Sequence, residues 1–506
     1  MPDVQNVVVI MTDQQRADAC AREGFPLDTT PFLDELARDG TWFDRAYTST
    51  PVCAPARTSF LTGRFPTATN VWLNEQHEAA RYERDLFDVM NDEGFATALV
   101  GKNHSYLDPE KADHRDQYGH WGAQNETAEA TMTEADEEWE EWMGELSLFD
   151  GGGGWSNEPT PTPVETQCAH RCVSHAREWI ESLDDDRSFF TWLSLPEPHN
   201  PYQVPEPHFS LFPPEELPPV EAGPEGLDDK RFKWRWLREI GVARALREAP
   251  DADYDDEVLP RLRSLYYGML RMVDDQVRRF VEFLDDAGLR EETLLVCCSD
   301  HGDFVGQYGL MRKGVDLPEA TARVPLLFEG PGVEADPEPS DAHVSLVDVF
   351  PTLCEAVGAD VPAGVQGRSL WPLLTGEGEV DANEAFSSVY AECGYGGRHS
   401  TPADVPPLAE ASKNELNEHT QTGRTAMVRR DHWKLVVDAE DGPKLYDLET
   451  DPAEATDLSD DPEHGDVLRD LLAEFASWSL RVRDTLPEVY PVDDLPAAFD
   501  GPPGQR

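Results

Sequence analysis

A cysteine and an arginine four residues apart give the chain its most suggestive stretch, which runs from Pro51 to Arg64 and includes Cys53, Pro55 and Arg57. The prolines predict a loop that turns into a short helix, because proline fits a first helical turn, where its missing N–H is not needed. In such a helix Cys53 and Arg57 share one face. The free N–H groups of a helix N-terminus favour an anion. The stretch could therefore seat a tetrahedral anion, although a half-buried thiol beside a helix cap has the same pattern.

Further polar residues follow apolar runs that predict four strands, over residues 6–11, 95–100, 189–195 and 294–299. Their continuous apolar character is typical of a parallel sheet covered on both faces. The carboxyl ends of parallel strands lie at one edge of the sheet, where α/β proteins bind ligands. We therefore expect the residues that follow these strands to lie together. They are, in chain order, Asp13 and Gln14, Lys102 and His104, His199, and Asp300 and His301.

Taken singly, these groups also have ordinary explanations. Asp13 and Gln14 carry the oxygens that a hard cation prefers, but they also fit an Asx turn. Lys102 and His104 would point the same way from an extended chain, but a solvated lysine and a loop histidine fit equally well. Lysine is scarce, with 8 in 506 residues, and this favours a specific role for Lys102.

Together these segments resemble the sulfatase family of the alkaline-phosphatase-like superfamily. The resemblance lies in CAPARTSFLTGR from Cys53, in GKNH ending at His104, in the proline-rich loop around His199, and in SDHG followed by Lys313, all in the family's order. It implies an α/β fold in which helices flank a large, mixed, mostly parallel sheet. A smaller C-terminal α+β subdomain carries a short antiparallel sheet. We expect the catalytic domain over residues 1–375 and the subdomain over 376–506.

The resemblance also implies a sulfuric ester hydrolase. In this family the cysteine of C-x-P-x-R is oxidised after translation to formylglycine, so a formylglycine-generating maturation enzyme is an expected partner of this chain. The hydrated aldehyde is a gem-diol, and a divalent cation lowers the pKa of the hydroxyl that attacks sulfur. The metal ligands that the resemblance implies are Asp13, Gln14, Cys53, Asp300 and His301.

The resemblance assigns catalytic roles to six residues, beginning with Cys53 as the nucleophile. Arg57 would hold the gem-diol, while Lys102 and Lys313 would neutralise the oxygens of the sulfuryl group. His199, alone or with Lys313, would protonate the leaving oxygen. His104 would take a proton from the second hydroxyl and so release sulfate.

Two positions depart from the commonest pattern, since many sulfatases have aspartate at Gln14 and asparagine at His301. The related phosphonate monoester hydrolases share this departure, which leaves phosphonate or phosphodiester hydrolysis as an alternative. The Lys102 and His104 pair, which that branch generally lacks, favours a sulfatase. We expect Ca²⁺ as the metal. The carboxylates would also suit Mg²⁺, whereas the imidazole would favour Mn²⁺. A binding protein with an unmodified Cys53 is the alternative of another class.

Composition limits the partners and the environment. The formal net charge is −58, which disfavours nucleic acid and anionic membranes as partners. Acid excess with scarce lysine fits a surface adapted to molar salt, so we expect a halophilic source. No signal peptide or apolar span is visible, and we expect a cytoplasmic protein that acts on a small-molecule or glycan sulfate ester. Nothing in the sequence indicates the oligomeric state.

The remaining segments carry weaker signals. Residues 106–165 are polar, acidic and interrupted by four consecutive glycines, and we expect them to form a surface insertion. A short strand is expected from Trp42 to Tyr47. A β-hairpin is expected over residues 426–437, and a closing helix over residues 467–485.

Overall fold

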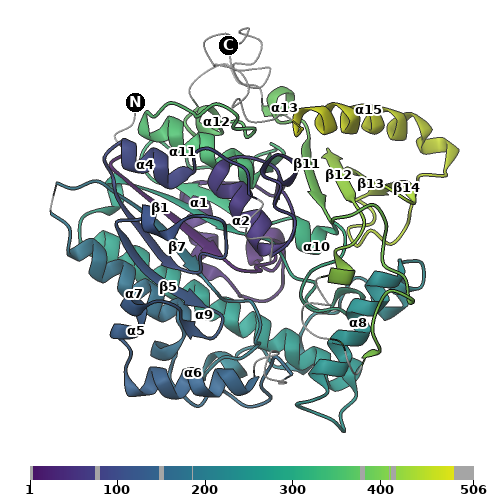
Figure 1. Ribbon diagram of the computed structural model, residues 1–506, viewed down its shortest axis with the longest axis horizontal. Coiled ribbons are helices and arrows are strands. Elements are labelled where there is room, and N and C mark those ends of the chain that lie inside the picture. The colour runs from purple at the N-terminus through teal and green to yellow at the C-terminus, as the bar shows by residue number, and fades with distance from the viewer. Residues whose placement is uncertain are drawn as a thin grey trace.

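The computed structural model describes residues 4–74, 80–146, 153–184, 186–376, 382–408, 411 and 418–483. The chain is α/β, as predicted. An eight-stranded sheet lies between two layers of helices, and a four-stranded antiparallel sheet follows it near the C-terminal end (Figure 1).

The large sheet has the strand order β2-β9-β8-β1-β7-β4-β5-β6. Its five consecutive strands from β8 to β5 are parallel, whereas β9 is antiparallel to β8 and β6 is antiparallel to β5. Strand β1 lies in the middle, and its Val9 is opposite Trp192 of β7 and Val296 of β8. The strands are β1 (Asn6–Thr12), β2 (Thr41–Trp42), β4 (Ala96–Gly101), β5 (His114–Gly119), β6 (Gly122–Ala123), β7 (Phe189–Leu195), β8 (Thr293–Ser299) and β9 (Leu326–Glu329).

The side chains of β1 show how both faces of the sheet are covered. Val7, Val9 and Met11 pack into a core with residues of α2, α4 and α11, whereas Val8 and Ile10 pack into a second core with residues of α1, α7 and α9. All five are at most 1% exposed. A strand covered on both faces carries a nearly continuous apolar run, here from Val7 to Met11, which is why it was recognisable in the sequence.

The helices have the following bounds: α1 (Pro31–Asp39), α2 (Cys53–Thr62), α3 (Pro66–Thr69), α4 (Leu86–Asp92), α5 (Glu126–Ala130), α6 (Glu134–Leu146), α7 (Cys168–Glu181), α8 (Phe232–Ala245), α9 (Leu259–Asp286), α10 (Glu319–Ala322), α11 (Val349–Val357), α12 (Trp371–Leu374), α13 (Ala382–Ala385) and α15 (Gly465–Arg481). A short π-helical turn over Tyr254–Val258 leads into α9. The predicted strand from Trp42 to Tyr47 is two strands in different sheets, since β3 (Ala46–Tyr47) pairs with β10 (Val344–Ser345).

The described parts of the expected surface insertion over residues 106–165, which are 106–146 and 153–165, instead contribute to the large sheet and to buried cores. Strand β5 pairs in parallel with β4, and Tyr118 at its end is fully buried. Trp139 of α6 and Trp155 are each 1% exposed. The prediction failed because β5 lies near the edge of the sheet, where half-exposed positions carry polar residues and the apolar signal is lost.

The C-terminal sheet joins the catalytic part of the chain through buried charges. Its order is β11 (Val389–Cys393), β12 (Thr425–Arg430), β13 (Trp433–Asp438) and β14 (Gly442–Asp447), and α15 packs against it. The predicted hairpin and closing helix are therefore confirmed. Lys434 is fully buried, and its Nζ lies 2.8 Å from Glu319 and 2.7 Å from Glu454. The boundary between residues 375 and 376 stays a prediction.

Two observations bear on the environment of the protein. Within the described ranges, no helix is both long enough and apolar enough to cross a membrane. All eight cysteines are free and buried.

Candidate active site

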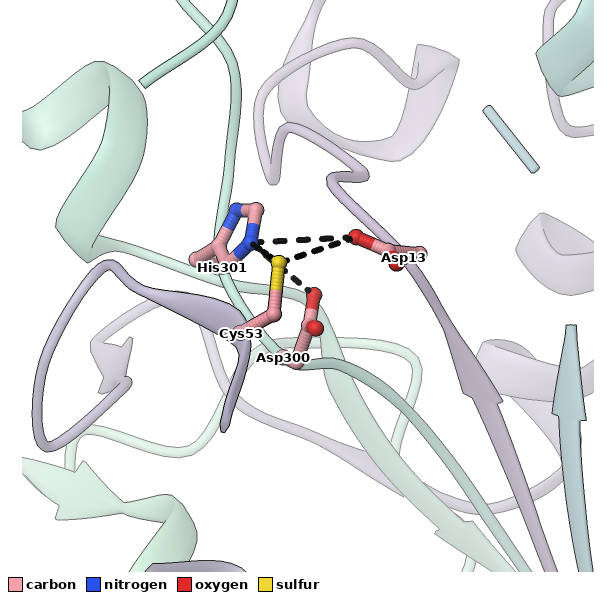
Figure 2. A group of neighbouring side chains, drawn as sticks. All are labelled: Asp13, Cys53, Asp300 and His301. Atoms are coloured by element: carbon pink, nitrogen blue, oxygen red, sulfur yellow. Dashed lines mark hydrogen bonds and ion pairs between the residues drawn. The ribbon is translucent and has the colours of Figure 1, made fainter. Parts of the chain in front are cut away.

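The carboxyl ends of the parallel strands bring the predicted residues together at one edge of the sheet. Asp13 follows β1, Lys102 follows β4, and Asp300 follows β8. The N–H of Asp300 donates to the carbonyl oxygen of Thr12, and the N–H of Asp13 donates to that of Glu197. Figure 2 shows Asp13, Asp300 and His301 gathered around Cys53.

Helix α2 begins at Cys53, so its N-terminal end faces this group. The side-chain oxygen of Asn74 accepts a hydrogen bond from the N–H of Ala54, 3.0 Å away. One turn further on, Arg57 is fully buried. Its Nε donates to Oδ2 of Asp300 at 2.7 Å, and its Nη1 donates to the carbonyl oxygen of Lys102 at 2.9 Å. The predicted helical spacing thus ties the nucleophile candidate to the acidic cluster.

Four buried side chains form a group that fits a metal ion. The ligand atoms of Asp13, Cys53, Asp300 and His301 all lie within 4.8 Å of one another, and each residue is at most 1% exposed. Nε2 of His301 lies 3.1 Å from Sγ of Cys53, 3.7 Å from Oδ1 of Asp13 and 3.6 Å from Oδ1 of Asp300. Two buried carboxylates, an imidazole and a sulfur on one side of a sheet are the donor set of a divalent cation site.

Gln14 lies beside this group and is held in one orientation. Its backbone has a φ of 72°, in the left-handed region. Its Nε2 donates to Asp303, and its Oε1 accepts from Nζ of Lys313 at 2.9 Å. The amide oxygen therefore faces the lysine in this structure, and a role for Gln14 as a metal ligand stays a prediction.

Positive charge surrounds the cysteine. Burial and Asp13 oppose ionisation of the Cys53 thiol, but Lys102, Lys313 and His301 outweigh them and lower its pKa well below the usual range. Burial also opposes the charge of Lys313, yet Cys53 and Asp13 raise its pKa. Lys102 forms an ion pair with Asp13 and is 3% exposed. Lys313 therefore stays protonated beside position 53, and Lys102 is paired with a buried carboxylate.

The two histidines predicted to be catalytic, His104 and His199, differ in their partners. Burial and Lys102 lower the pKa of His104, whose side chain interacts with Cys53. Nδ1 of His199 lies 2.6 Å from the carbonyl oxygen of Asn200, so Nδ1 carries a hydrogen. Burial also lowers the pKa of His199 well below the usual range.

One site residue was missed by the sequence analysis. Nε2 of His120 lies 3.1 Å from Nζ of Lys102, and the His120 ring stacks on that of His199 with the centroids 3.7 Å apart. It directly follows β5, so the rule that located the other residues applies to it as well. The available signal was the aromatic cluster of Tyr118, His120 and Trp121 within an otherwise acidic segment.

Comparisons with known proteins agree with this geometry. The family model described as Sulfatase matches residues 5–359. An arylsulfatase of Clostridium perfringens is 26% identical over 489 residues, covering 92% of this chain and 93% of its own length. A choline-sulfatase of Rhizobium meliloti is 28% identical over 505 residues, covering 95% of this chain and 88% of its own length. The phosphonate monoester hydrolase of Agrobacterium radiobacter has a TM-score of 0.73 at 23% identity, covering 94% of this chain and 96% of that chain, which shows a shared fold.

The fold is that of an alkaline-phosphatase-like hydrolase, and the candidate site lies at the carboxyl edge of its mostly parallel sheet. The match over residues 5–359 is more specific, and the chain belongs to the sulfatase family. The predicted enzyme class, a sulfatase acting as a sulfuric ester hydrolase, is therefore confirmed. The family implies a bound metal and a formylglycine, and the buried cluster around Cys53 fits a metal site.

Proposed function

We propose that this protein hydrolyses sulfate monoesters, with Cys53 converted to formylglycine and a divalent cation held beside it. The observation that carries the proposal is the position of Cys53, whose Sγ lies 3.1 Å from His301 and 3.8 Å from Asp13 at the start of α2. A residue placed there can attack an ester while touching the groups that hold the cation.

Asp13, Gln14, Asp300 and His301 would hold the cation together with position 53. Ca²⁺ is the ion we propose, with Mg²⁺ and Mn²⁺ as alternatives that the same donors accept. When bound, the cation would supply Lewis-acid activation of the nucleophile. Arg57 keeps Asp300 in place through its short Nε contact and balances the charge of the buried carboxylates.

The protonation of the remaining residues suits the two halves of a transfer reaction. Lys102 and Lys313 both lie close enough to Cys53 to lower its pKa, and they would neutralise the oxygens of the sulfuryl group. The lowered pKa of His104 keeps it neutral near pH 7, as a general base requires. Since the pKa of His199 is lowered and that of Lys313 is raised, Lys313 is favoured to share the proton donation to the leaving oxygen.

The proposed substrate is a small-molecule or glycan sulfate ester, and a formylglycine-generating enzyme is the proposed maturation partner. Arylsulfatase and choline-sulfatase are the names of two relatives, and both refer to sulfate esters. The side chains of Arg57, Lys102 and Lys313 supply enough positive charge to bind the singly charged sulfate monoester. They would also accept a phosphorus ester, so charge alone does not decide between the two. The Lys102 and His104 pair is what favours sulfate.

A panel of matched sulfate, phosphate, phosphodiester and phosphonate esters tests this assignment. The protein is assayed with Ca²⁺, Mg²⁺ and Mn²⁺ in molar salt, and Cys53→Ala serves as the control. We expect kcat/KM for the sulfate monoester to exceed that for every other ester by at least about tenfold, which corresponds to about 1.4 kcal/mol. A preference for the phosphonate monoester or the phosphodiester would contradict the assignment and favour the alternative.

A further inference from the structure

A fourth histidine, His120, lies among the side chains of the candidate site, although the roles given above do not use it. Strand β5 carries it to the site, because β5 pairs in parallel with β4, and Gln117 of β5 lies opposite Gly101, the residue before Lys102. The side chain of His120 is only 11% exposed. It is thus shielded from bulk solvent at the same edge of the sheet as Lys102.

Three contacts fix the plane of the His120 ring. Its Nε2 lies 3.1 Å from Nζ of Lys102. One face lies flat against His199, with the ring centroids 3.7 Å apart and the planes 13° apart. Trp121 meets the ring edge-on at a centroid distance of 5.5 Å. A rotation of the imidazole would break both the stack and the contact with Lys102.

The contact with Lys102 determines which ring nitrogen carries the hydrogen. An ammonium group can only donate, so Nε2 of His120 accepts and Nδ1 holds the N–H of the neutral ring. Nδ1 is buried and has no hydrogen-bond partner within the part of the chain that the structure describes. Buried polar groups are usually paired. The unpaired N–H beside Lys102 and His199 is therefore available to an acceptor that arrives with the substrate.

We propose that Nδ1 of His120 donates a hydrogen bond to an oxygen of the transferred sulfuryl group, and that its ring positions His199. The proposal rests on the proposed function of the site. His120 lies between Lys102, which would neutralise the sulfuryl oxygens, and His199, which would act at the leaving oxygen. Its N–H would bind the transferred group, and the stack would restrict rotation of the His199 ring.

Two substitutions separate these roles. His120→Asn keeps an N–H close to the position of Nδ1 but removes the stacking ring, whereas His120→Phe keeps a flat ring and removes the donor. His114→Phe is the control, since His114 lies at the start of the same strand and stacks on Trp179 at 5.8 Å, away from the site. Affinity for inorganic sulfate is measured by calorimetry on metal-loaded protein carrying Cys53→Ala, so the result does not depend on turnover.

We expect His120→Phe to weaken sulfate binding at least about tenfold, while His120→Asn and His114→Phe stay within about threefold of the parent. In catalytically intact protein, His120→Asn should lower kcat more than it raises KM, because the misplaced His199 acts only in the chemical step. The substrate is the ester that the wild type hydrolyses best, so a failed sulfate preference would leave this test intact. Unchanged sulfate affinity in His120→Phe would overturn the donor role, and unchanged kcat in His120→Asn would overturn the positioning role.

Discussion

Sγ of Cys53 lies 3.1 Å from Nε2 of His301, although the two residues are 248 positions apart in the chain. Cys53 reaches this position as the first residue of α2, and His301 reaches it just beyond the end of β8 (Figure 2). The contact joins the residue that would carry the nucleophile to one that would hold the cation.

The planar guanidinium of Arg57, with its several N–H donors, is expected to be needed for both activity and stability. Arg57→Lys keeps the charge but cannot bond Asp300 and Ser194 at the same time, as the 2.7 Å and 2.6 Å contacts require. We expect kcat to fall about a hundredfold and the free energy of unfolding to fall by about 2 kcal/mol. Arg84→Lys, at an exposed ion pair with Asp92, is the control and should change neither. Wild-type kinetics in Arg57→Lys would show that charge alone suffices.

Removing one carboxylate from the proposed metal site should reduce metal affinity and rate together. We expect Asp300→Asn to weaken metal binding at least about tenfold, because a neutral amide attracts a cation less and also disturbs the contact with Arg57. Metal content after dialysis and kcat at saturating metal measure the two effects. Asp336→Asn, at an exposed loop position, is the control. Full metal content with full activity would remove Asp300 from the site.

The dependence of the rate on pH should reflect the pKa of His104. A general base works only when neutral, and burial together with Lys102 lowers the pKa of His104 below its ordinary value of 6.5. Because His104 would act in the release of sulfate, after the alcohol has left, the acid limb is expected in kcat and below pH 6.5, with kcat falling as the pH drops through the pKa of His104. His104→Ala should lower the rate and remove this limb. An acid limb of the same shape in His104→Ala would assign it to another group.

The sequence predicted most of the site because the relevant signal is local. Each buried strand is apolar over most of its length, and the polar residue that follows it marks the edge where the strands end. Asp13, Lys102 and Asp300 could therefore be grouped without knowing any contact between them. The spacing of Cys53 and Arg57 likewise required only helix geometry.

The rest of the site depends on contacts that no local pattern records. His120 was missed because β5 has a polar, half-exposed sequence that hides its place in the sheet. The amide orientation of Gln14 is set by Asp303, 289 positions away. Such choices follow from tertiary packing, so only the folded chain shows them.

Salt should stabilise the protein, because its net charge of −58 makes the folded chain repel itself. Screening extends about 10 Å at 0.1 M salt and about 3 Å at 1 M. The melting temperature is expected to rise when KCl increases between these concentrations. Sucrose, which stabilises by exclusion and not by screening, is the control. A melting temperature that does not change with KCl would contradict adaptation to high salt.

The mass of residue 53 in active protein tests the central claim most directly. Trypsin releases the peptide over residues 46–57, because cleavage follows Arg45 and Arg57. We expect a peptide with the mass of formylglycine at position 53, and we expect kcat to rise in proportion to the converted fraction across preparations. Full turnover of a sulfate ester by protein whose Cys53 is entirely an unmodified thiol would contradict the account.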